Sequence, residues 1–118
     1  MEEESGGIES RASPTRAEVR SVRLDQYQKL MAGLPAQIEK AAQHLYDNYF
    51  SRDPHHPILK GKWVPDRQKR LKVWRVDITR HYRALAWVEE QEVDGVRVTT
   101  YVWYWCGSHE DYNRLVGT

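Results

Sequence analysis

Hydrophobic residues in the first half of the chain recur every three to four positions, which is the spacing of amphipathic helices. The pattern runs over residues 27–34 and again over residues 38–49, with Gly33 and Pro35 between the two runs. Glycine commonly ends a helix, and proline suits the first turn of the next one. The pattern therefore predicts two helices joined in a hairpin with one apolar face to bury, the first of them capped by Asp25.

Beyond a proline-bounded loop over residues 51–57, the hydrophobic period changes from 3.6 to 2, which indicates strands. An Asp-Gly pair at positions 94–95 separates two of these segments and favours a tight hairpin turn. The last segment is apolar on both faces near its end, as in a central strand. Trp103 and Trp105 are expected to share one of those faces. Strands are predicted over residues 18–24, 58–64, 70–78, 81–90 and 96–106.

This order of elements predicts an α+β domain over residues 18–118. The helical hairpin packs on one face of a small, mostly antiparallel sheet of four or five strands, and a short C-terminal helix follows. Residues 1–17 are polar, rich in Gly and Ser, and without periodicity, so they are expected to form a disordered tail. The sheet face that carries Arg75 and Arg83 is expected to stay open as a basic, concave surface.

The composition limits the class of protein. A chain of 118 residues suits one domain, and no run of 18 apolar residues offers a transmembrane helix. The N-terminus lacks the basic-then-apolar pattern of a secretory signal, so a cytoplasmic location is expected. Cys106 is the only cysteine, which excludes an internal disulfide and a cysteine metal cluster. It is expected to be a small, buried hydrophobic residue.

The charge distribution is uneven although the net charge is only +1. Residues 51–83 contain ten Lys or Arg against three Asp, whereas residues 84–118 contain six acids against two Arg. A concentrated basic region suits a polyanion such as RNA. A solvated basic hairpin without a ligand would have the same composition.

Three segments together resemble the RelE/ParE superfamily of toxins from bacterial type II toxin–antitoxin systems: "DPHHPILKGKW", "WRVDITRHYRALAW" and "YVWYWCGSHEDYNRL". The resemblance extends over about residues 20–117 and is greatest to the RelE-like branch, which includes plasmid-stabilisation proteins. It implies a microbial-ribonuclease-like domain that cleaves mRNA on the ribosome, and an antitoxin protein as partner. The ParE branch has the same fold and instead poisons DNA gyrase.

Metal-independent cleavage of RNA needs a base for the 2′-hydroxyl, an acid for the leaving 5′-oxygen, and cations for the phosphoryl group. His109 is predicted as one proton-transfer group and His56 as the other, because histidine titrates near neutral pH. Arg83 and Arg75 are predicted to stabilise the phosphoryl charge. Tyr112 is predicted to assist proton transfer or to stack on a base. No metal or cofactor is expected.

Flanking phosphates and bases require further contacts along the same basic region. The residues predicted to bind RNA are His55, Lys60, Lys62, Arg70, Lys72 and Arg80.

Each of these residues also has a purely structural interpretation. His109 follows Ser108, a good N-cap, and is then only a residue in the first turn of a helix. His55 and His56 lie beside prolines as ordinary loop residues would. Arg75 would pair with an acid on a neighbouring strand.

Three functions therefore remain open: an mRNA-cleaving toxin, a gyrase-binding toxin, and an inactive domain of the same fold that binds RNA or an antitoxin. The presence of His and Arg on a basic sheet favours the nuclease, because a protein-binding poison needs no proton-transfer groups.

Overall fold

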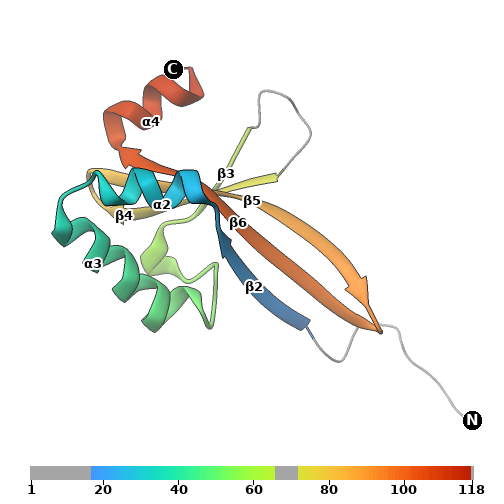
Figure 1. Ribbon diagram of the computed structural model, residues 1–118. Coiled ribbons are helices and arrows are strands. Elements are labelled where there is room, and N and C mark those ends of the chain that lie inside the picture. Colours follow the sequence, from blue (N-terminus) through green and yellow to red (C-terminus); the bar gives the residue numbers. More distant parts are fainter. Residues whose placement is uncertain (1–16, 66–71, 118) are drawn as a thin grey trace, which may run out of the picture.

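The computed structural model describes residues 17–65 and 72–117. Within these ranges, five strands form one sheet in the order β2-β6-β5-β4-β3. A helical hairpin packs against one face of the sheet, and a C-terminal helix packs against the other (Figure 1). The predicted α+β class is confirmed. No helix in the described ranges is long and apolar enough to cross a membrane.

The helical hairpin consists of α2 (Asp25–Ala32) and α3 (Ala36–Leu45), and α3 runs into a π-helical turn over Tyr46–Phe50. The N-cap position of α2 is Leu24, without a side-chain hydrogen bond, so the predicted cap at Asp25 is displaced by one residue. The apolar face of the hairpin covers the sheet as predicted. Its buried side chains are Tyr27, Met31, Ile38 and Phe50.

Four strands pair antiparallel in chain order: β3 (Lys62–Val64), β4 (Lys72–Thr79), β5 (Tyr82–Val93) and β6 (Val96–Ser108). β3 is shorter than predicted because the preceding residues, Pro57–Leu59, form a 3₁₀ turn. The Asp-Gly turn is confirmed. Asp94 and Gly95 have φ values of 52° and 79°, and a two-residue hairpin turn with positive φ at both positions follows the twist of its strands.

β2 (Ala17–Arg23) lies at one edge of the sheet and pairs in parallel with β6. The sequence predicted this strand but not its parallel pairing. β2 and the outer part of the β5–β6 hairpin extend beyond the helices as an arm (Figure 1). Of the predicted tail, residues 1–16 lie outside the described residues, and Ala17 is the first residue of β2.

A bulge in β6 separates two tryptophans that alternation alone would place together. Leu85 lies opposite Trp105 and the next residue, Ala86, lies opposite Trp103, so Tyr104 is an additional residue in the ladder. Trp103 therefore joins the core under the hairpin, whereas Trp105 packs on the other face. The expectation that they share a face is wrong, because one extra residue reverses the alternation beyond it.

The second face of the sheet is partly covered by α4 (His109–Val116). Tyr112 is buried there and Val116 is half-buried, and both pack with Val73, Leu85 and Trp105. The expectation of an open face is therefore wrong: α4 buries its own apolar side on it. The part of this sheet face that lies beside α4 is not covered by the helix.

Candidate functional site

The two predicted catalytic arginines lie on the α4 face and share one carboxylate. Asp77 Oδ1 is 3.2 Å from Arg83 Nε and 3.6 Å from Arg75 Nε, and the three side chains are only 11–16% exposed. Asp77 lies opposite Arg83 in the β4–β5 register and two residues from Arg75 on its own strand. We call these three residues the Arg-Asp-Arg cluster. The cluster carries a net charge of +1. Because its side chains are poorly solvated, the electric field of this charge on neighbouring groups is weakly screened.

Arg83 also holds the turn between β4 and β5. Its Nη1 donates to the carbonyl oxygen of Arg80 at 3.2 Å and to that of Thr79 at 3.4 Å. The guanidinium is therefore tied to the turn on one side and to Asp77 on the other. This arrangement fixes the position of His81, the exposed residue that follows Arg80 in the turn.

His109 is joined to the same turn by the backbone. Its N–H donates to the carbonyl oxygen of His81 at 2.7 Å. Ser108 is the N-cap of α4, and its Oγ accepts from the N–H of Asp111 at 3.1 Å. Both imidazoles are exposed. We call this place, where the β4–β5 turn meets the start of α4, the histidine edge.

Gly107, which lies opposite Arg83 in the ladder, makes room for an aromatic side chain. A Cβ at this position would lie 2.7 Å from Cζ2 of Trp105, closer than such atoms approach. The glycine therefore permits the Trp105 indole to lie against the backbone just before the histidine edge.

Tyr112 is buried, and its ring faces Arg75, with the guanidinium carbon 5.4 Å from the ring centroid. This cation–π contact links α4 to the Arg-Asp-Arg cluster. Arg75, Arg83 and Tyr112 thus lie together as predicted, but the structure encloses them instead of exposing them on an open basic face.

His56 does not lie with these residues. Its Nδ1 accepts from the N–H of Ile58 at 3.1 Å and its ring contacts Tyr49 at a centroid distance of 4.8 Å. His55 stacks on Trp74 at 4.0 Å. These contacts place both histidines on the hairpin face of the sheet, opposite the Arg-Asp-Arg cluster. The predicted pairing of His56 with His109 is not formed.

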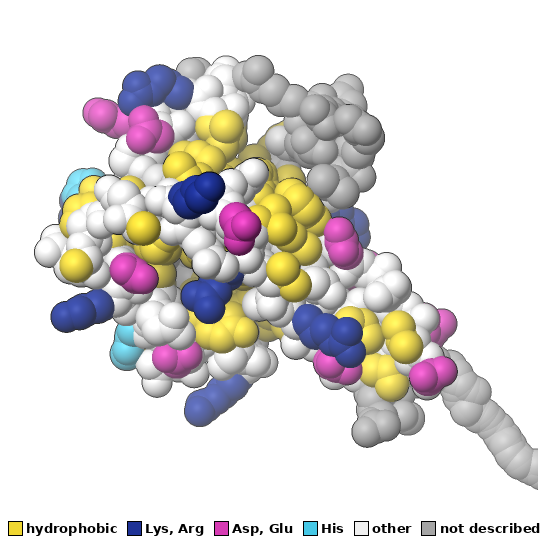
Figure 2. Space-filling model, viewed as in Figure 1, with side chains coloured by type: hydrophobic (Ala, Val, Ile, Leu, Met, Phe, Trp, Pro, Cys, Tyr) yellow, Lys and Arg dark blue, Asp and Glu magenta, His cyan; other side chains and the backbone are white. Residues whose placement is uncertain are grey.

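Most of the residues predicted to bind RNA are exposed but scattered. Lys62 lies opposite Arg75 and therefore faces the α4 side, and Arg80 lies in the turn of the histidine edge. Lys60 lies two residues before β3, and Lys72 is the first residue of β4. Arg70 lies outside the described residues. On the face shown in Figure 2, basic and acidic side chains are interspersed, without a single basic patch.

His81 and Asp77 are site residues that were not predicted from the sequence. The signal for Asp77 was its position two residues after Arg75, which puts both side chains on one face of a strand. The signal for His81 was its place in a short turn between two basic strands. Its contact with His109 depends on the strand register and could not be predicted.

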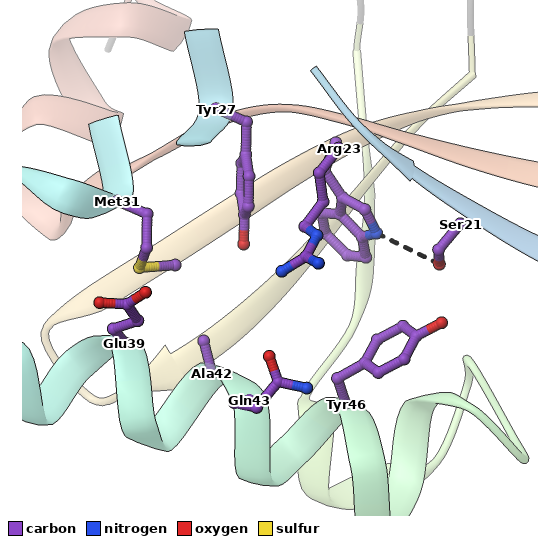
Figure 3. A pocket seen from close by; sticks show the side chains of 9 residues that line it. Ser21, Arg23, Tyr27, Met31, Glu39, Ala42, Gln43 and Tyr46 are labelled. Atoms are coloured by element: carbon purple, nitrogen blue, oxygen red, sulfur yellow. Dashed lines mark hydrogen bonds between the residues drawn. The ribbon is translucent and has the colours of Figure 1, made fainter. Parts of the chain in front are cut away.

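A hollow of about 170 Å³ lies on the hairpin side, between β2 and the two helices (Figure 3). Arg23 and the Tyr27 hydroxyl point into it, and Trp103 Nε1 donates to Ser21 Oγ at 3.4 Å in its wall. Burial raises the pKa of Tyr27, so its hydroxyl stays protonated and can donate a hydrogen bond. This hollow is separated by the sheet from the Arg-Asp-Arg cluster.

The fold is similar to that of a solved structure, a YoeB/ParE toxin from Agrobacterium tumefaciens. The TM-score is 0.55 at 15% sequence identity, and the match covers 76% of this chain and 98% of that chain. No protein-family model matches the sequence. No curated protein matches it either. At this level of identity the comparison establishes a fold like that of the YoeB/ParE toxin.

Proposed function

We propose that the protein is a toxin of a type II toxin–antitoxin system that inhibits translation as a metal-independent, ribosome-dependent endoribonuclease on mRNA. The observation that carries this proposal is the backbone hydrogen bond from the N–H of His109 to the carbonyl oxygen of His81, because it joins two exposed histidine residues at one edge. The YoeB/ParE-like fold supports the toxin class and, with it, a cognate antitoxin as partner.

In the proposed reaction the 2′-oxygen attacks phosphorus and the bond from phosphorus to the 5′-oxygen breaks. One imidazole accepts the proton of the 2′-hydroxyl, and the other donates a proton to the leaving 5′-oxygen. The products end in a 2′,3′-cyclic phosphate and a 5′-hydroxyl. His109 and His81 take these two roles, and His56 takes neither because it lies against Tyr49 on the other face.

The cations of the site have different tasks in this proposal. Arg80 is exposed beside His81 and contacts the phosphate. Arg83 is a positioning residue, since it holds the turn through the carbonyl oxygens of Thr79 and Arg80. Arg75 and Arg83, paired with one Asp77, leave one positive charge that stabilises the phosphoryl group through its field.

A second candidate function is a toxin that binds and inactivates DNA gyrase. The burial of the Arg-Asp-Arg cluster favours it, because side chains that are only 11–16% exposed give a phosphate little access to either guanidinium. Such a toxin would need neither imidazole of the histidine edge.

Expression of the protein in bacteria separates the two candidates. The nuclease stops protein synthesis without a DNA-damage response, and it yields mRNA fragments whose downstream pieces begin with a 5′-hydroxyl. A DNA-damage response with protein synthesis intact would instead establish the gyrase poison. Fragments that begin with a 5′-phosphate would contradict the proposed chemistry.

A further inference from the structure

Trp63 is the most exposed of the large hydrophobic side chains in the described ranges, at 51%. It lies in β3, the short strand at the opposite edge of the described sheet from β2. An exposed tryptophan on an edge strand gains little from burial and presents a flat aromatic surface to a ligand.

The indole of Trp63 rests on a rigid aromatic base. Its centroid is 4.7 Å from that of Trp74 and 5.8 Å from that of His55, and the last two rings stack at 4.0 Å. Trp74 is buried, and its Nε1 donates to the carbonyl oxygen of Pro54 at 3.1 Å. Gly61 leaves room for the Trp74 ring, since a Cβ at this position would collide with it.

Among the described residues, the charged side chains close to Trp63 in the chain and at the start of the neighbouring strand are mainly positive. Lys60 and Lys62 precede Trp63 and are exposed, as is Lys72 at the start of the neighbouring strand. Asp53, an acid of the loop that carries His55, already accepts a hydrogen bond from the N–H of His55 at 3.0 Å. A flat ring among lysines suits a nucleobase with its phosphates better than an apolar protein surface.

We propose that Trp63 stacks on a base of single-stranded RNA, with Lys60 and Lys62 binding the adjoining phosphates. This inference rests on the proposed function and assigns a second subsite to the same substrate. Trp63 lies opposite Trp74, five residues along β4 from Thr79 at the histidine edge, which is about 17 Å. The strand of RNA crosses the β3 edge, because Lys62 faces the α4 side and Trp63 the hairpin side.

The test is the affinity of the purified protein for a fluorescently labelled 12-nucleotide single-stranded RNA, measured by anisotropy without ribosomes. Trp63→Ala should weaken binding by about 5- to 100-fold, the contribution of one stacked base. Trp63→Phe should retain most of the affinity because it keeps an aromatic face. The matched control is Ile58→Ala, which removes another exposed hydrophobic side chain, 45% exposed and without an aromatic face, and it should bind like the wild type.

Equal affinity of Trp63→Ala and the wild type would overturn the inference, as would an equal loss in Ile58→Ala, which would show that the loss of RNA affinity does not come from an aromatic face. Absence of any RNA binding by the wild type would also overturn it. Binding that depends on Trp63, in a protein that cleaves no mRNA on the ribosome, would support the subsite and contradict the proposed function. If the wild type cleaves mRNA and Trp63→Ala binds and cleaves RNA equally well, the proposed function is supported and the subsite is contradicted.

Discussion

The backbone N–H of His109 donates to the carbonyl oxygen of His81 across 2.7 Å, and this bond joins the start of α4 to the turn between β4 and β5. The turn is held in place by Arg83, which is in turn paired with Asp77. The backbone positions of the two histidines therefore depend on a charge cluster that is itself mostly buried.

The first prediction concerns Asp77. Asp77→Asn leaves two poorly solvated guanidiniums without their shared carboxylate, so the free energy of unfolding should fall by about 3 kcal/mol. Urea denaturation measures this. The matched control is Asp111→Asn, which removes the acid of an exposed pair with Arg114 and should cost less than about 1 kcal/mol. Equal losses in the two variants would show that the cluster does not stabilise the fold.

The second prediction concerns Gly61. In Gly61→Ala the new methyl group meets the Trp74 ring, so the variant should lose about 1–3 kcal/mol of stability and shift the Trp63 surface. In the control, Gly33→Ala, the nearest atom is a carbonyl oxygen at 3.5 Å, and stability should stay equal or rise by up to about 1 kcal/mol. A stable Gly61→Ala variant with unchanged near-ultraviolet circular dichroism would contradict the described packing of Trp74.

The third prediction concerns Cys106. Burial raises the pKa of its thiol to about 12, so the folded protein at pH 8 should react with a disulfide reagent only when it unfolds. Because the folded pKa lies above the unfolded one, this thiol favours folding fully below about pH 9 and loses that effect as the pH rises towards 12. Rapid reaction of the native protein in the absence of urea would contradict this.

The helices and strands were predictable because their signals are local. The spacing of Tyr27 and Met31 indicates one buried helix face. The Asp94–Gly95 pair indicates a turn that needs a positive φ at both of its residues. The α+β class followed from the order of these elements.

The parts that were not predictable depend on register and on packing across the sheet. One extra residue at Tyr104 places Trp103 and Trp105 on opposite faces, and no pattern in the sequence predicts that bulge. The pairing of Arg83 with Asp77 and the meeting of His81 with His109 both follow from the β4–β5–β6 register. The sequence identified His109 correctly as a residue beyond the last strand but chose His56 as its partner, because two histidines in one loop are the more visible signal.

The measurement that tests the central claim most directly is the rate of mRNA cleavage on purified ribosomes by the wild type and by the variant with both His81→Ala and His109→Ala. Loss of general acid–base catalysis should slow cleavage by at least about 100-fold. His44→Ala, which changes an exposed histidine on α3, is the matched control and should cleave like the wild type. Thermal unfolding of all three proteins, with the double variant melting close to the wild type, confirms that it is folded. Cleavage by a folded double variant at the wild-type rate would contradict the assignment of the histidine edge as the catalytic site.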